Sequence, residues 1–511
     1  MYRDVYIMQL GGVSWEEQLS LPEGVHWFFL HEQDLNTVPD LLKKLKRKTF
    51  DVILLEEMSK ALSLKEIAKF ILPYTVLYDH TNQIEDPQAA LFLQQICAQP
   101  FDFSDRQQIV YHFTKGIFRG QYGDKMKPID MVVNPNFEGS IQYNGFQNIE
   151  LEGDFGKDFR PLLTWKYNKP VSKLNPVEFW LEYAKEGDCE LRLRFYNIPE
   201  GSTSDILNEK VVEGADLDEA ILIDNDFGAY IAIMVEAKGH GRVQIGSLHG
   251  RLTRYDFGKL SMGGKIFADR KRQEVIYYFH PGDFKPPLNV YFSGFRRAEG
   301  FEGFGIMRSL GAPFLLFQDP RIDGGAFYLG TEEFEQGIKN IIKEHLDLLG
   351  FTDRQLNLSG ISMGTFGAMY YGADFNPNAI IVSKPLANLG NIAKDAKLST
   401  PGVFPTSFDI LKAHTGGNGE REIEQLNQHF WKKFRAANFK DTTFALVYMM
   451  NEDYDQTAFK DLLECLYYSD SKVISKGIPG RHNDDNDGTL SWFMNQYKDI
   501  MQKDFGRELK W

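Results

Sequence analysis

The sequence predicts a mixed α/β protein of three parts, in which two α/β regions flank a region of antiparallel strands. Short buried strands alternate with helices near the start of the chain, and again after about residue 270. Between these regions apolar residues recur at every second position, a period typical of half-buried strands. We therefore expect three parts, over residues 1–128, 130–265 and 270–511.

Length and composition fit a globular protein with several cores. The chain has 511 residues, of which 43% are hydrophobic and 25% charged. Its net charge of −14 gives no general attraction to phosphate backbones or anionic lipid, so nucleic acid is not an expected partner. Cys97, Cys189 and Cys465 lie far apart, which indicates neither a disulfide framework nor a metal site. We expect no bound metal and no bound cofactor.

The first residues predict a strand rather than a targeting signal. A short apolar run is interrupted by Gln9, Gly11 and Gly12, and acidic residues follow it. No apolar stretch of the chain is long enough to span a bilayer. The sequence therefore predicts a cytoplasmic protein, with membrane contact only at the surface or through a partner.

The first part is expected to form a parallel, Rossmann-like sheet. Four short apolar runs predict buried strands, and helical spacing separates them at residues 38–48 and 64–71. No Gly-x-Gly-x-x-Gly opens a helix here, so the sequence does not support a nucleotide site. The predicted strands are VYIMQL (5–10), VHWFFL (25–30), DVILLE (51–56) and YTVLYDH (74–80).

The middle part is expected to form a β-sandwich of short strands. In CELRLRFY (189–196) apolar side chains occupy one face and charged side chains the other. The same alternation occurs in VEFWLEYA (177–184), AYIAIMVEA (229–237) and RVQIGSL (242–248), with turn signals between them. Many carbohydrate-binding modules share this architecture, as do many unrelated domains, so glycan binding is one of several hypotheses.

In the last part the α/β alternation returns. Thr331 caps a predicted helix with an apolar stripe, which Gly350 ends. A last helix is expected at 491–505. The predicted strands are VIYYF (275–279), LNVYFSG (288–294), PFLLFQD (313–319), LNLSG (356–360), AIIVSKP (379–385), TTFALVYMM (442–450) and KVISKGI (472–478).

Gly360-Ile361-Ser362-Met363-Gly364 stands between a predicted strand and a predicted helix, TFGAMYYGA (365–373). A Gly-x-Ser-x-Gly motif in this context predicts a nucleophile elbow, because the flanking glycines let a strained serine lie close to its neighbours. The pattern is typical of an α/β-hydrolase-like domain with Ser362 as the nucleophile. The alternative is an ordinary serine in a glycine-rich turn.

The remaining groups of a serine-dependent site follow in the expected order, serine, acid, histidine. Glu452 comes directly after one strand and His482 directly after the next, so they are the predicted orienting acid and base. Asp455 and Asp453 are alternatives for the acid. The predicted oxyanion donors are the backbone N–H groups of Met363 and Phe295.

Two details qualify these assignments. Ser293 stands where the turn before an oxyanion donor commonly has histidine. The stretch Asn483–Gly488 has the composition of a calcium loop, but an aligned loop would place Met494 where a bidentate glutamate is needed. We interpret that stretch as a turn that positions His482.

Three segments together resemble the family of accessory secretory protein two of the bacterial accessory Sec system: GISMGTFGAMYYGADFNPNAIIVSKPLANLGN (360–391), NEDYDQTAF (451–459) and GIPGRHNDDNDGTL (477–490). The resemblance covers essentially the whole chain. It implies a protein in the cytoplasm of Gram-positive bacteria that works with other accessory secretory proteins and a dedicated Sec motor and channel. The exported substrate would be a serine-rich repeat glycoprotein adhesin.

The resemblance also implies O-acetylation of N-acetylglucosamine on that adhesin, with a triad at Ser362, Glu452 and His482. Two alternatives remain open at this stage: a carbohydrate esterase that uses the same triad with water, and a non-catalytic export chaperone on a hydrolase fold. The acetyl donor is unknown. Acetyl-coenzyme A is a candidate, although the sequence has no recognisable coenzyme A motif.

Overall fold

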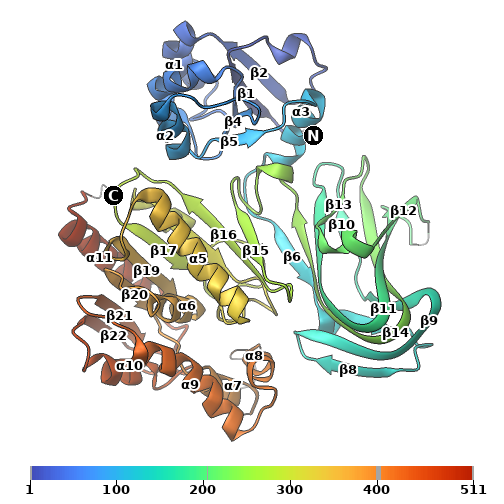
Figure 1. Ribbon diagram of the computed structural model, residues 1–511, viewed down its shortest axis with the longest axis vertical. Coiled ribbons are helices and arrows are strands. Elements are labelled where there is room, and N and C mark those ends of the chain that lie inside the picture. The colour runs from blue at the N-terminus through green and yellow to red at the C-terminus, as the bar shows by residue number, and fades with distance from the viewer. Residues whose placement is uncertain (1–2, 204, 399–403, 405, 509–511) are drawn as a thin grey trace.

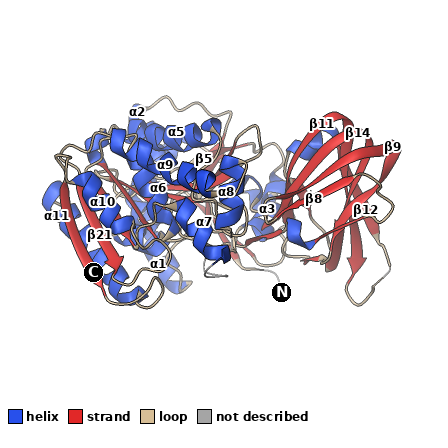
Figure 2. Ribbon diagram, turned by 90° about the horizontal axis from the view of Figure 1, so that it is seen from below, coloured by secondary structure: helices blue, strands red, loops and turns tan. Residues whose placement is uncertain are grey.

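The computed structural model describes residues 3–203, 205–398, 404 and 406–508, which form three β-sheets (Figure 1). The N-terminal sheet lies at one end of the molecule. The curved middle sheet and the large C-terminal sheet lie next to each other below it in this view. Seen from below, most helices lie at one end of the molecule, with the α/β regions, and the long strands of the middle sheet form the other end (Figure 2). The predicted α/β fold class is confirmed.

The N-terminal sheet has five parallel strands in the order β2-β1-β3-β4-β5. Of the predicted helical segment 64–71, residues 64–70 belong to a 3₁₀ segment, Met58–Phe70, rather than to an α-helix. The strands are β1 (Val5–Leu10), β2 (Val25–Leu30), β3 (Val52–Leu55), β4 (Val76–Asp79) and β5 (Gln99–Phe101), and the α-helices are α1 (Val38–Lys44), α2 (Pro87–Gln95) and α3 (Arg106–Gly116).

Long bent strands, rather than short ones, build the middle region. The predicted strands 177–184 and 189–196 are one continuous strand, β11, and the predicted strands 229–237 and 242–248 are likewise one strand, β14, so the prediction of turns between them was wrong. The strands of the middle region are β6 (Gly123–Met126), β7 (Met131–Val133), β8 (Ser140–Asn144), β9 (Asn148–Trp165), β10 (Lys169–Val171), β11 (Val177–Pro199), β12 (Asn208–Glu213), β13 (Ile221–Ile223) and β14 (Ala229–Leu252).

The β11–β14 ribbon bends where glycines face each other. Gly187 pairs with Gly241, and a β-carbon on Gly187 would lie 3.0 Å from the Gly241 Cα. The bend brings Phe179 and Phe195, on opposite halves of one strand, to a ring-centroid distance of 5.4 Å. The folded sheet therefore encloses a core of its own. The glycines bend the ladder without ending it, because they lack the side chain that would collide there.

The C-terminal sheet has eight strands in the order β15-β16-β18-β17-β19-β20-β21-β22. From β18 to β22 the pairs are parallel, whereas β15 and β16 pair antiparallel. The strands are β15 (Lys265–Ala268), β16 (Glu274–His280), β17 (Leu288–Phe292), β18 (Phe314–Gln318), β19 (Leu356–Ile361), β20 (Ala379–Ser383), β21 (Thr443–Met449) and β22 (Lys472–Ile478).

Helices cover both faces of this sheet. One core packs the sheet against α5, α6, α9 and α10, and the other packs it against α4 and α11. Thr331 caps α5 and Gly350 ends it in a left-handed conformation, as expected. The helices are α4 (Phe304–Ser309), α5 (Glu332–Leu349), α6 (Met363–Gly372), α7 (Leu389–Leu398), α8 (Ser407–Thr415), α9 (Glu420–Ala436), α10 (Ala458–Leu466) and α11 (Asn486–Phe505).

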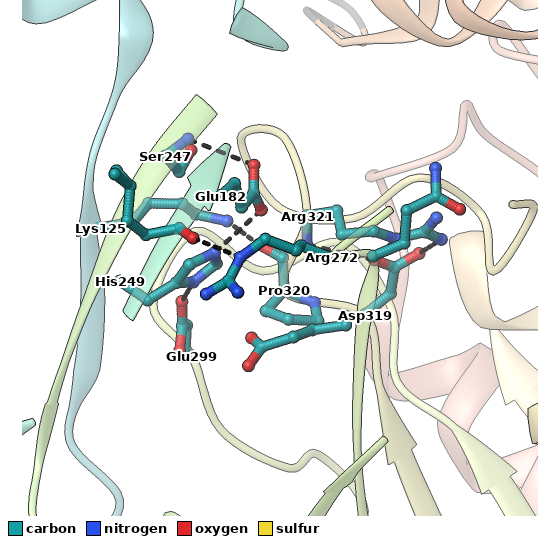
Figure 3. Close-up of polar contacts among 12 residues, drawn as sticks. Lys125, Glu182, Ser247, His249, Arg272, Glu299, Asp319, Pro320 and Arg321 are labelled. Carbon is teal, nitrogen blue, oxygen red and sulfur yellow. Dashed lines mark hydrogen bonds and ion pairs between the residues drawn. The ribbon is translucent and has the colours of Figure 1, made fainter. Parts of the chain in front are cut away.

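A buried ionic network joins the middle region to the C-terminal sheet (Figure 3). His249 of β14 contacts Glu299 through Nδ1 at 2.5 Å and Glu182 through Nε2 at 2.9 Å. Arg251, two residues further on, forms ion pairs with Glu299 and with Glu274 of β16. Nearby, the Lys125 ammonium donates to the carbonyl of Pro320. Buried charges that are paired in this way fix the relative position of the elements that carry them.

The network makes stability dependent on pH. Burial alone would lower the pKa of His249, but the carboxylates of Glu299 and Glu182 raise it to about 9. Because this pKa is above the value of about 6.5 in an unfolded chain, His249 stabilises the fold fully below about pH 6.5. That stabilisation is lost as the pH rises through 9.

We therefore expect the melting temperature to fall between about pH 7 and about pH 9.5, and to fall less steeply in His249→Gln. One pKa unit corresponds to about 1.4 kcal/mol, so the loss should be on the order of a few kcal/mol. His240→Gln, which replaces an exposed histidine on the same strand, is the matched control. If the melting temperature fell equally steeply with pH in the wild type, His249→Gln and His240→Gln, the prediction would be contradicted.

Candidate active site

Ser362 occupies a strained backbone position between β19 and α6. Its φ and ψ angles are 55° and −121°, a conformation that L-residues rarely adopt. The Ser362 N–H donates to the carbonyl of Ser383 on the neighbouring strand, at 2.9 Å. Ser362 is the N-cap residue of α6, where the helix dipole favours negative charge.

The two flanking glycines are required by close backbone contacts. A β-carbon on Gly360 would lie 2.3 Å from the Gly364 carbonyl carbon and oxygen. A β-carbon on Gly364 would lie 2.0 Å from the Phe292 carbonyl oxygen. Both distances are far below van der Waals contact, so no side chain fits at either position. The sequence motif is therefore a structural requirement of this turn.

The structure brings Ser362, His482 and Glu452 together. Ser362 Oγ lies 2.8 Å from His482 Nε2. His482 Nδ1 lies 2.8 Å from Glu452 Oε1 and 2.9 Å from Oε2. His482 is only 2% exposed. A hydroxyl, an imidazole and a carboxylate in this order can transfer a proton from the serine while the acid orients the ring.

The other two carboxylates of the same loop make different contacts. Asp453 Oδ1 accepts from the His482 backbone N–H at 3.0 Å, which holds the histidine loop. Asp455 is buried and accepts from the backbone N–H groups of Ala387 and Asn388, after β20. The ring of His482 is thus oriented by Glu452, while the two aspartates hold backbone segments around it.

The predicted oxyanion donors lie in two segments that touch each other. Met363 is the first residue of α6, so the helix leaves its N–H without an internal acceptor. Phe295 follows β17, whose Phe292 is paired with Gly360 of β19. The turn before Phe295 is held from two sides, because Gly294 N–H donates to Glu302 and the Tyr328 hydroxyl donates to the carbonyl of residue 293.

Sequence reasoning missed an aromatic wall beside the triad. The Tyr454 ring stacks on His482 with centroids 4.2 Å apart and planes at 7°. Phe404 lies 6.4 Å from Tyr454 and 5.1 Å from Phe295, measured between ring centroids. Burial raises the pKa of Tyr454, so its phenol stays neutral beside the imidazole. Tyr454 adjoins the predicted acids in sequence, which is the one signal that could have drawn attention to it.

Lys384 is a buried lysine that lies near the charge of Glu452. Its ammonium donates to the Asn486 side chain at 2.5 Å. Burial lowers the pKa of Lys384, and the negative charge of Glu452 opposes that shift. Asp485 caps α11 by accepting from the Gly488 N–H, so part of the calcium-like stretch is a helix cap next to His482.

Metal-binding and membrane-spanning features are both absent from the described residues. Within that part of the chain, no group of three or more histidine, cysteine, aspartate or glutamate side chains is arranged to hold a metal ion. No helix among residues 3–203, 205–398, 404 and 406–508 is both long and apolar enough to cross a bilayer.

The Gly364 contact predicts a large effect from a small substitution. Gly364→Ala should move α6 away from β17, lower the melting temperature and abolish ester turnover. Overpacking of this kind costs about 1–3 kcal/mol or more. Gly305→Ala is the control, because a β-carbon there meets nothing within 4 Å. A Gly364→Ala protein as stable and active as Gly305→Ala would contradict this account of the turn.

Substitutions of Glu452, Asp453 and Asp455 should have different effects on activity and stability. Glu452→Gln should lower kcat for an activated acetyl ester by about 10⁴-fold, because the orienting acceptor is lost. Asp453→Asn keeps an acceptor oxygen for the His482 N–H and should stay within about tenfold of wild type. Asp455→Asn should act mainly on stability. Its melting temperature should fall clearly, whereas its kcat should change little. An Asp455→Asn protein that melts normally but lacks activity would move the acid assignment to Asp455.

Known proteins resemble this chain along its whole length. A family model described as "Accessory Sec system GspB-transporter" matches residues 5–507. Accessory secretory protein two of the accessory Sec system of Streptococcus gordonii is 51% identical over 509 residues, which cover 99% of this chain and 100% of that protein. The protein of the same name in Staphylococcus aureus (strain NCTC 8325 / PS 47) is 40% identical over 513 residues, covering 99% of this chain and 98% of that protein.

A solved structure matches the whole fold. A chain in the Glycosylation Associate Protein (Gap123) complex from Streptococcus agalactiae superposes with a TM-score of 0.95 at 39% identity. The match covers 99% of this chain and 100% of that chain.

Proposed function

The chain belongs to the accessory secretory protein two family of the accessory Sec system, and on that premise we propose that it is a serine-dependent O-acetyltransferase. Its proposed acceptor is N-acetylglucosamine on a serine-rich repeat glycoprotein adhesin, and it also supports export of that adhesin. The observation that carries the catalytic proposal is the continuous contact from Ser362 Oγ through the His482 ring to Glu452.

The first half of the reaction would transfer the acetyl group to the protein. His482 Nε2 takes the proton from Ser362 Oγ, which attacks the acetyl carbonyl carbon of the donor. The negative charge on the carbonyl oxygen is stabilised by the N–H groups of Met363 and Phe295. His482 then gives the proton to the leaving group, and the acetyl ester of Ser362 remains. Acetyl-coenzyme A is the donor that we propose.

The second half would reverse these roles. A sugar hydroxyl gives its proton to His482 and attacks the acetyl carbon. The Ser362 oxygen leaves and takes the proton back from His482. Glu452 accepts from the His482 Nδ1–H throughout and stabilises the imidazolium form of the ring.

The aromatic wall favours transfer over hydrolysis. Tyr454, Phe404 and Phe295 form a series of ring contacts from the base to an oxyanion donor. Apolar rings on this side leave less room for water at the acetyl-enzyme, and a bound sugar hydroxyl then competes better for the acetyl group. Hydrolysis by the same triad is the alternative chemistry.

The export role would rest on the remaining surfaces. Residues 1–128 and 130–265 carry none of the triad residues, and we propose that these two parts bind partners or glycan. The proposed partners are other accessory secretory proteins, the Sec motor and channel, and the adhesin. The similarity to a chain of the Gap123 complex supports the first of these. The proposed location is the cytoplasm, with membrane contact through partners.

Ser362→Ala separates the two roles. The substitution removes one hydroxyl oxygen, far from most of the protein surface, so the fold and its partner contacts should persist. Turnover of an activated acetyl ester by the purified protein should fall by about 10⁴-fold or more. Cells that carry the variant should still export the adhesin, but its glycans should lack acetyl groups. The measurement is the acetyl content of adhesin in the cell wall fraction, by mass spectrometry.

Two results would contradict the proposal. Near-normal ester turnover by Ser362→Ala would rule out the nucleophile. Complete loss of export in a strain whose Ser362→Ala protein is stably folded would show that export requires the chemistry.

A further inference from the structure

Residues 319–328, between β18 and α5, form a strained loop that is buried along its length. Ile322, Phe327 and Tyr328 have φ angles of 56°, 55° and 60°. Bulky side chains rarely occur in this left-handed conformation, because it costs free energy at each such residue. Strain of this kind persists only where surrounding contacts hold it, so the contacts of the loop indicate its role.

The carboxylate of Asp319 closes the loop. Its Oδ2 accepts from the backbone N–H groups of Ala326 and Tyr328, both at 2.9 Å. The Arg321 guanidinium donates to Oδ1 at 2.9 Å and to Oδ2 at 2.7 Å (Figure 3). Burial would raise the pKa of Asp319, but the charge of Arg321 lowers it, so the carboxylate stays ionised. Hydrogen bonds to an ionised acceptor are strong, and Asp319 therefore fixes the position of Tyr328.

Tyr328 connects the loop to the turn before Phe295. Its hydroxyl donates to the carbonyl of Ser293 at 2.8 Å. The other end of the same peptide group is also held, because the Gly294 N–H donates to Glu302 at 2.8 Å. The peptide group that precedes Phe295 by one position is therefore fixed at both ends.

The peptide group after Phe295 is fixed by the same loop. The Arg296 N–H donates to the carbonyl of Gly324 at 3.1 Å. Gly324 lies against the Phe295 ring, where a β-carbon would come within 2.5 Å. Because peptide groups are planar, holding the groups on either side restricts the direction of the Phe295 N–H between them. No backbone carbonyl among the described residues accepts from this N–H, which leaves it available to a substrate oxygen.

The loop also contacts the helix that carries the other proposed donor, Met363. A β-carbon on Gly325 would lie 2.4 Å from the terminal methyl carbon of Met363, so that side chain packs directly on the loop backbone. The hydroxyl of Tyr371, on α6, donates to the carbonyl of Tyr328 at 2.6 Å. The loop therefore touches both segments that supply the proposed oxyanion donors.

We propose that residues 319–328 are a positioning loop for the oxyanion site, in which Asp319 and Tyr328 set the direction of the Phe295 N–H without touching the substrate. The inference rests on the proposed function for the roles of Phe295 and Met363. Small displacements matter here, because an error of about 1 Å in the position of a catalytic group can cost about 10²-fold in rate.

Tyr328→Phe tests the proposal, because it removes the hydroxyl that holds Ser293 and keeps the ring. The readout is the ratio of kcat/KM for p-nitrophenyl acetate to kcat/KM for its thionoester, in which sulfur replaces the carbonyl oxygen. Sulfur is a weak hydrogen-bond acceptor, so oxyanion donors act much less on the thionoester. Partial unfolding lowers both values by the same factor and leaves the ratio unchanged.

Tyr74→Phe is the matched control. Tyr74 is also a buried tyrosine whose hydroxyl donates to a backbone carbonyl, that of Phe279, at 2.7 Å. Tyr328→Phe should lower the ratio at least about tenfold, through the loss of activity on p-nitrophenyl acetate. Tyr74→Phe should keep the wild-type ratio.

A Tyr328→Phe ratio that stays near the wild-type value, whether or not both rates fall, would overturn the proposal. If Tyr328→Phe does not fold, Asp319→Asn is judged by the same criterion, because it removes the charge that holds the Tyr328 N–H. Failure of the proposed function would appear differently, as turnover of both esters by Ser362→Ala.

Discussion

The backbone conformation of Ser362 is the constraint on which the site depends. A residue at φ 55° and ψ −121° can be tolerated only if its surroundings hold it there. Here β19 and its neighbours supply one anchor, and the direct contact of α6 with the Phe292 carbonyl supplies the other. Because α6 starts immediately after the serine, the same turn leaves the Met363 N–H without an acceptor inside the helix. The proposed nucleophile and the proposed oxyanion donor therefore belong to one turn.

The arrangement of Ser362, His482 and Glu452 also depends on the contacts of the three acidic residues in the loop after β21. Glu452 reaches the imidazole, Asp453 reaches the backbone of the same histidine, and Asp455 is buried against the segment after β20. Two of the three therefore hold the backbone of segments around the proposed catalytic groups. Tyr454 completes the loop by stacking on His482. One short segment thus orients the base, holds its backbone and covers one of its faces.

Much of the α/β architecture could be predicted from sequence because its signals are local. The strand before Ser362, the cap at Thr331 and the left-handed Gly350 depend on residues within a few positions of each other. The continuity of β11 could not be predicted, because Gly187 gives the same signal in a turn and in a bent strand. Only its pairing with Gly241, on a different strand, distinguishes the two. The helices α7, α8 and α9 were not predicted either.

In the candidate site, too, some features could be predicted from local sequence and others depended on distant segments. Ser362, Glu452 and His482 could be proposed because each follows a strand in the order that the fold requires. The roles of Asp453 and Asp455 could not, since both contacts are to backbone groups of distant segments. The ionic network around His249 was also invisible, because its members belong to different regions of the chain.

The most direct test of the account is to trap the acetyl-enzyme. The purified protein is mixed with p-nitrophenyl acetate, quenched in acid within the first turnovers, and digested for peptide mass spectrometry. The account predicts one added acetyl group on the peptide that contains Ser362, and none on that peptide in Ser362→Ala. Rapid turnover with no acetyl group on Ser362, or with the acetyl group on another residue, would contradict it.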